Sequence, residues 1–147
     1  MIDEFFMRSA INEAIIAKNK NEIPVGAVIV RNNEIISKGH NETILYNSQL
    51  YHAEINSIIS ASKHLSDWRL NDCDIYVTME PCLMCFGAII LSRIRRLVFG
   101  INNNISGFLS SDYKFNIQSI KIPIINGILE EEIIDFTKDY FDNLRDK

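Results

Sequence analysis

The sequence predicts a three-layer α/β/α domain over residues 1–147, with helices on both faces of a central mixed sheet of five strands. Segments of helical period alternate with β-branched segments along the chain, which is the pattern of such layered folds. No repeat or linker divides the 147 residues, and this length is typical of one domain. The chain is 47% hydrophobic and 23% charged, an ordinary globular composition.

The first half of the chain is expected to form a helix, a hairpin, a loop and a second helix. Apolar residues at helical spacing over 2–19 predict the first helix, which a following Asn- and Lys-rich run and Pro24 terminate. A β-branched run at 25–30, turn-forming residues, and Ile35-Ile36 then predict a hairpin. After a loop, residues 52–64 are predicted as a helix with one face formed by Ile55, Ile58 and Ile59.

The second half is expected to alternate in the same way. Residues 74–78 predict a short buried strand, and a helix is predicted from Pro81 to about Ser92, because proline is tolerated at the first helical position. Residues 97–99 predict another strand, followed by a loop at 101–116. The run 120–125, interrupted by Pro123, suits an edge strand, and an amphipathic pattern predicts a last helix over 128–145.

Charge and composition exclude several classes of protein. The net charge of −4 does not predict general electrostatic binding to nucleic acid, although Arg93, Arg95 and Arg96 form a local basic cluster. No apolar stretch approaches the ~20 residues that span a bilayer, so no membrane association is expected. The acidic start lacks the basic region of a secretory signal, and three cysteines then indicate a reducing, cytoplasmic compartment.

Two short segments carry the residue types of a metal site. His52-Ala53-Glu54 and Pro81-Cys82-Leu83-Met84-Cys85 together form the H-x-E and P-C-x-x-C signature of zinc-dependent base and nucleoside deaminases. The two cysteines are three residues apart, so they share one face of a first helical turn, where the helix N-terminus favours thiolates. His52 and Glu54 are separated by roughly 200° around a helix, so they converge only beyond its end. We therefore expect two helix N-termini to face one zinc ion.

The number of ligands indicates a catalytic site. His52, Cys82 and Cys85 make three, and three protein ligands with a water is the pattern of catalytic zinc. Zinc lowers the pKa of that water, and Glu54 is expected to take its proton and return it to the leaving amine. These two steps make up a hydrolytic deamination.

Two plainer interpretations stay open at this point. A structural zinc site needs a fourth ligand, for which Cys73, His40 and His64 are the candidates, Cys73 first because it precedes the strand that leads to Pro81. A redox pair is the other, although no thioredoxin-like context surrounds the cysteines. A structural site would leave Glu54 without a role.

Longer runs of sequence carry a resemblance over about residues 20 to 130. The most specific is Glu-Pro-Cys-x-Met-Cys-x-Gly-Ala at 80–88, followed by Ser92-Arg93-Ile94. The matching runs are residues 22–30, 39–41, 52–55, 67–70, 76–85, 87–94, 98–100 and 127–129. Through them the chain closely resembles the bacterial tRNA-specific adenosine deaminases of the cytidine deaminase superfamily, and the resemblance implies a cytidine deaminase-like fold.

The resemblance implies a role for each matching residue. His52, Cys82 and Cys85 would bind one Zn²⁺ per subunit, and Glu54 would transfer the proton. The substrate contacts implied are Asn41 on the flipped-out nucleoside, the Ala53 N–H on the reacting base, and an apolar wall of Ile23, Pro24 and Val25. A homodimer would convert adenosine to inosine at the wobble position of a tRNA anticodon loop, where the target base is already unstacked.

The chain departs from the family pattern in three places. Ser48-Gln49-Leu50-Tyr51 replaces the usual Asp-Pro-Thr-Ala before His52. Asn103 and Ile105 stand where an aspartate and a lysine are common, and losing the lysine weakens phosphate contact. The last helix, usually basic at its end, carries acids, and its Tyr140 and Phe141 suit either base stacking or packing. These acids are Asp139, Asp142 and Asp146.

Two other functions remain as alternatives. One is deamination of a free base or nucleoside such as cytosine or guanine, and the other is a non-catalytic zinc-binding subunit that delivers RNA. The stretch Ser92–Arg96 favours the tRNA type because it is expected to add basic surface beside the active site. An intact Glu54 argues against the non-catalytic subunit, which needs no proton shuttle.

Overall fold

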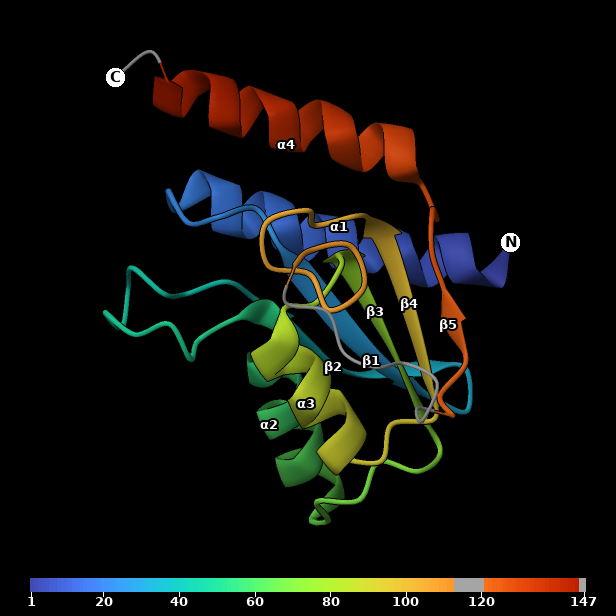
Figure 1. The fold of residues 1–147 in the computed structure, drawn as a ribbon. Helices are drawn as coiled ribbons and strands as arrows, with labels where there is room; N and C mark the ends of the chain where they lie inside the picture. Colours follow the sequence, from blue (N-terminus) through green and yellow to red (C-terminus); the bar gives the residue numbers. More distant parts are fainter. Residues whose placement is uncertain (113–120, 146–147) are drawn as a thin grey trace.

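A mixed five-stranded sheet lies between two layers of helices in the computed structural model, which describes residues 1–112 and 121–145 (Figure 1). The strand order is β2-β1-β3-β4-β5, in which β1 is antiparallel to β2 and β3, whereas β4 is parallel to β3 and β5. The elements are α1 (Ile2–Asn19), β1 (Gly26–Arg31), β2 (Glu34–His40), α2 (Ala53–Leu65), β3 (Cys73–Met79), α3 (Leu83–Leu91), β4 (Arg96–Ile101), β5 (Ile124–Ile125) and α4 (Glu130–Arg145). The three-layer fold predicted from the sequence is confirmed.

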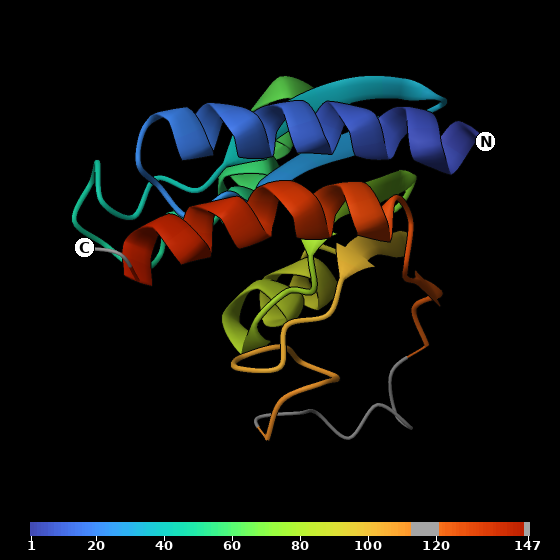
Figure 2. The ribbon, with the colours of Figure 1, turned by 90° about the horizontal axis from the view of Figure 1, so that it is seen from above.

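Each face of the sheet has its own apolar core. Helices α2 and α3 cover one face, and α1 and α4 lie side by side over the other (Figure 2). Along β1 the side chains alternate between the two, so Ala27 and Ile29 join the α2/α3 core while Val28 and Val30 join the α1/α4 core. Because the central strands are buried on both faces, most of their residues are apolar, although β3 also buries Asp74 and Thr78.

Three local predictions are wrong in detail. Helix α3 begins at Leu83 rather than at Pro81, because Cys82 is an extended N-cap residue with φ −73° and ψ 174°. Helix α2 buries Ile58 but exposes Ile59, because Glu54 and Ser57 occupy part of its inner face. The edge strand is limited to Ile124–Ile125, and positions 113–120 lie outside the described residues.

The described helices include none that is both long and apolar enough to cross a membrane.

Candidate active site

The N-termini of α2 and α3 lie close together beyond the carboxyl end of the central strand β3. His52 is the N-cap residue of α2 and Cys82 that of α3, and both have extended backbone. Cys85 follows in the first turn of α3. An N-cap side chain projects past the end of its helix, so the imidazole and the two sulfurs approach one another as the spacing predicts.

The three side chains have the separations of a tetrahedral zinc site. The His52 Nδ1 atom lies 3.6 Å from the Cys82 sulfur and 3.4 Å from the Cys85 sulfur, and the three ligand atoms all lie within 4.8 Å of one another. With Zn–N and Zn–S bonds of about 2.0 and about 2.3 Å, tetrahedral geometry puts nitrogen and sulfur about 3.5 Å apart. The donor set therefore fits a zinc ion without rearrangement.

The described residues offer no fourth ligand to this group. Cys73 lies at the opposite end of β3, roughly 20 Å of strand away, and His64 is exposed near the end of α2. His40 instead contacts Glu13, with 3.4 Å between its Nδ1 atom and the carboxylate. The structural zinc site with Cys73, His40 or His64 as a ligand has no support.

The pKa values of the two cysteines shift in opposite directions. A hydrogen bond from Cys85 lowers the pKa of Cys82 to about 4, although partial burial opposes this shift. The same bond, together with burial, raises the pKa of Cys85 far above its usual value. Zinc binds thiolates, so its binding at this site would release the proton of the Cys85 thiol.

Glu54 stands beside the ligands in a dry environment. It lies in the first turn of α2 and is only 3% exposed. Burial raises the pKa of Glu54 to about 7. A carboxyl group with this pKa can both accept and release a proton near neutral pH, which is the requirement for a general acid–base.

A cavity of about 110 Å³ opens next to these groups. Of the substrate contacts predicted from the sequence, Ile23, Val25, Asn41 and Ala53 line it, whereas Pro24 does not. Ala53 is the first residue of α2, so its N–H has no partner within the helix. The full lining is Ile23, Val25, Asn41, His52, Ala53, Glu54, Met79, Glu80, Cys82, Asn103 and Ser106.

Two buried acids shape the cavity, and the sequence analysis assigned a role to neither. Glu22 accepts hydrogen bonds from the N–H groups of Ile44 and Leu45 and lies 3.4 Å from the Asn41 amide nitrogen. Glu80 binds the loop that carries Asn103 in the same way. The one available signal was that Glu22 begins, and Glu80 lies within, a mostly apolar run that matches the family.

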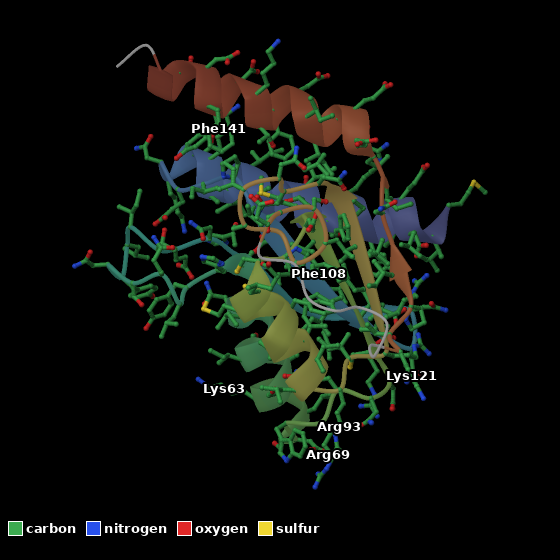
Figure 3. All side chains as sticks on the ribbon, in the orientation of Figure 1. Lys63, Arg69, Arg93, Phe108, Lys121 and Phe141 are labelled. Carbon is green, nitrogen blue, oxygen red and sulfur yellow. The ribbon has the colours of Figure 1, made fainter. Side chains whose placement is uncertain are left out.

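The predicted basic surface beside the site is wrong. Arg93 lies over the Trp68 ring, 5.0 Å from its centroid, and Arg95 and Arg96 bind Asp74. These residues follow the C-terminal end of α3, so about 13 Å of helix separates them from the cysteines. In Figure 3, Arg93 and Arg69 lie together at this far end.

Among the described residues that depart from the family pattern, only Asn103 lines the cavity. Tyr51 stacks on Tyr46 with 4.4 Å between ring centroids, just before His52. Ile105 and Phe141 line a separate apolar hollow of about 560 Å³ between α4 and the loop after β4. Asp146, one of the predicted acids of the last helix, lies outside the described residues.

Known proteins match the chain over nearly its whole length. Residues 1–101 match the cytidine and deoxycytidylate deaminase zinc-binding region. A tRNA-specific adenosine deaminase of Bacillus subtilis is 41% identical over 99% of this chain and 92% of its own length, and one of Rickettsia bellii is 44% identical over 95% and 100%. A solved structure from a study of A-to-I editing by tRNA:A34 deaminases is 36% identical, with a TM-score of 0.84 over 89% of this chain and 97% of that one.

Proposed function

Because the chain belongs to the cytidine and deoxycytidylate deaminase family, as one of its tRNA-specific adenosine deaminases, we propose that it converts adenosine to inosine at the wobble position of a tRNA anticodon. The single observation that carries the chemistry is the convergence of His52, Cys82 and Cys85 beside the buried Glu54. Three ligands with an adjacent carboxyl group suit hydrolysis at a carbon–nitrogen bond.

The side chains have distinct roles in this reaction. Zinc held by His52, Cys82 and Cys85 would supply a nucleophile at neutral pH by lowering the pKa of water. Glu54 accepts the proton that this water loses and delivers it to the exocyclic nitrogen of adenosine. The carbon–nitrogen bond then breaks and ammonia leaves. The oxygen from water remains as the carbonyl group of inosine, and the second proton of water ends on the ring nitrogen N1.

The cavity receives the base alone. With a volume of about 110 Å³ it excludes a stacked base pair, so the nucleotide must be splayed out from a loop. Ile23 and Val25 supply its apolar wall, and Asn41 with the Ala53 N–H supplies polar contacts. This need for an unstacked nucleotide favours an anticodon loop over duplex RNA.

We assign residues 1–147 to one deaminase domain that binds one zinc ion per subunit and acts as a cytoplasmic homodimer. Each ligand set comes from a single chain, which supports one ion per subunit. Apolar side chains on the outer faces of α2 and α3, among them Ile59, Ile90 and Leu91, are exposed in the single chain and suit a covering subunit. Sedimentation equilibrium tests the homodimer.

The decisive experiment uses an anticodon stem-loop with a wobble adenosine and the variant Glu54→Gln. We expect inosine from the wild-type protein and a fall in turnover of about a hundredfold to ten-thousandfold in the variant, with zinc content unchanged. A stem-loop with guanosine at the wobble position serves as the substrate control.

Free guanine, cytosine and adenosine are tested in parallel. Release of ammonia from a free base, with the stem-loop unreacted, would show that the substrate is a small molecule and not tRNA. Undiminished turnover in Glu54→Gln would refute the assigned proton transfer, and zinc binding without any turnover in the wild type would indicate an RNA-delivery subunit.

A further inference from the structure

Glu80 is a buried acid at the cavity that takes no part in the proton transfer assigned to Glu54. It is 1% exposed and follows β3 directly, two residues before Cys82. Its own N–H donates a hydrogen bond of 2.8 Å to the carbonyl oxygen of Ile101, the last residue of β4. The residue therefore lies between the turn that carries a zinc ligand and the loop that leaves the neighbouring strand.

The carboxylate of Glu80 is enclosed by donors from this loop. Its Oε1 atom accepts the Asn103 N–H at 3.1 Å and the Ser110 hydroxyl at 2.5 Å. Its Oε2 atom accepts the N–H groups of Leu109 and Ser110 at 2.8 and 3.0 Å. Hydrogen bonds to a charged acceptor are strong, and buried N–H groups that lose their acceptor are costly, so the carboxylate holds both ends of the loop.

The part of the loop that reaches the cavity is a single turn, residues 103–106. The Oδ1 atom of Asn103 accepts the N–H groups of Ile105 and Ser106 at 3.2 and 3.1 Å, and its Nδ2 atom donates to the Ser106 hydroxyl at 2.9 Å. Asn103 and Ser106 both line the cavity. The Gly107 N–H also donates to the Asn103 carbonyl oxygen at 2.9 Å. The bond from the Asn103 N–H to Glu80 therefore holds the start of the turn, and the Gly107 bond closes it.

The same loop is attached to the turn that carries the zinc ligand. The Phe108 N–H donates to the Pro81 carbonyl oxygen at 3.0 Å, and Gly107 forms an antiparallel bridge with Cys82. The Phe108 ring, labelled in Figure 3, stacks on Phe86 of α3 with 3.8 Å between centroids. Glu80 thus acts on a loop whose middle is already fixed by other contacts, and its bond to the Asn103 N–H holds the start of the turn 103–106.

We propose that Glu80 is a positioning residue of the deaminase, which holds the turn 103–106 where Asn103 and Ser106 close the cavity on the target nucleoside. The inference rests on the proposed function for the identity of that nucleoside, but the geometry of the loop is independent of it. Glu80 acts on substrate binding, and the zinc ligands and Glu54 act on the chemical step.

The variant Glu80→Gln separates these bonds. A glutamine retains one acceptor oxygen, which can still accept hydrogen bonds from the N–H groups of Leu109 and Ser110. Its NH₂ group lies against the Ser110 hydroxyl, which rotates to accept a hydrogen bond. The Asn103 N–H then faces a second donor. In the zinc-loaded protein without RNA, we expect the Asn103 amide to exchange hydrogen at least about tenfold faster, with the Leu109 amide within about twofold of wild type.

Substrate binding by the Glu80→Gln variant is also expected to weaken. The KM for the stem-loop should rise about tenfold, with kcat within about threefold and zinc content unchanged. Asp74→Asn is the matched control, since it alters a buried acid at the opposite end of β3 and should leave KM and the Asn103 amide as in wild type. Ser110→Ala, at an exposed residue, removes one bond to Glu80 and should raise KM about twofold to fivefold even if Glu80→Gln does not fold.

Unchanged exchange at Asn103, or a fall in kcat with KM unchanged, would overturn the proposal. If Ser110→Ala also leaves KM unchanged, the loop does not act on binding. Should the wild-type protein leave the stem-loop unreacted, the proposed function fails, and the exchange of the Asn103 amide alone then decides whether Glu80 holds the turn.

Discussion

The two sides of the cavity are held in place by contacts of different range. On the metal side, His52 and Cys82 are N-cap residues and Cys85 lies one turn further on, so their positions follow from where two helices begin. On the loop side, Glu22 and Glu80 accept hydrogen bonds from N–H groups 22 to 30 residues away in the sequence. The first side depends on local backbone geometry, and the second depends on the completed fold.

This difference separates chemistry from substrate binding. A changed ligand on the metal side removes a group that no neighbour can replace, because the described residues hold no other ligand within reach. Replacement of a carboxylate on the loop side, Glu22 or Glu80, shifts a backbone segment that other hydrogen bonds still hold in place. We therefore expect turnover to fall when the metal side is altered and KM to rise when the loop side is altered.

The largest effect is expected from Cys85→Ala. Loss of one of three ligands should remove most of the zinc and lower turnover by about a thousandfold or more. Cys73→Ala is the matched control, because Cys73 is buried at the far end of β3 and should leave the zinc content as in wild type. Zinc content by atomic emission and turnover on the stem-loop are the two measurements, and loss of zinc from Cys73→Ala would contradict the ligand set.

A smaller effect, on the loop side, is expected from Gly107→Ala. An added Cβ atom would lie 2.1 Å from the Glu80 Oε2 atom and 2.4 Å from the Asn103 carbonyl oxygen, so the loop must shift. We expect a loss of unfolding free energy of about 1–3 kcal/mol and a higher KM, with zinc retained.

Gly87→Ala provides the control for that change. An added Cβ atom at Gly87 would meet no atom within 4 Å. Alanine is also the better helix former, by about 0.5–1 kcal/mol, so the variant should unfold at the wild-type temperature or above. Thermal unfolding of both variants gives the comparison, and wild-type stability with wild-type KM in Gly107→Ala would contradict the close packing of the loop.

The metal side could be predicted from the sequence, because the start of each helix determines where its zinc ligands lie. The spacing of His52, Cys82 and Cys85 was sufficient to place all three at helix N-termini. The start of α3 was predicted two residues early, because the sequence does not distinguish an extended Cys82 from a helical one. Only the zinc site, toward which its sulfur points, explains the extended backbone. The alternation of apolar segments was equally sufficient to predict a mixed sheet of five strands, although it did not give the order of the strands.

The loop side could not be predicted, because nothing in the local sequence of Glu80 indicates which N–H groups it binds. The same limit explains the wrong position of the basic cluster. Arg93 is close to Cys85 in sequence, but α3 carries the chain away from the cavity before the arginines begin. Arg96 then binds Asp3, a residue of α1 that no local pattern could have paired with it.

The smallest effect is expected from Asp3→Asn, which lies on the α1/α4 face of the sheet and outside both sides of the cavity. Asp3 accepts hydrogen bonds from Arg96 at 2.8 Å and from the Tyr76 hydroxyl at 2.6 Å. Although burial opposes it, these two bonds lower the pKa of Asp3 below its ordinary 3.8. A depressed pKa stabilises the folded state above the unfolded value, and that contribution is lost as pH falls through the folded value.

The difference in unfolding free energy between wild type and Asp3→Asn should therefore be about 1 kcal/mol near neutral pH, should begin to fall near pH 3.8, and should vanish only below the lowered pKa of the folded state. Asp139→Asn, on the exposed part of α4, controls for the loss of one negative charge. Urea denaturation at several pH values measures the difference, and turnover and KM should match wild type throughout. A changed KM in Asp3→Asn would show that the two faces of the sheet are coupled, and the separation between metal side and loop side would then not account for substrate binding by itself.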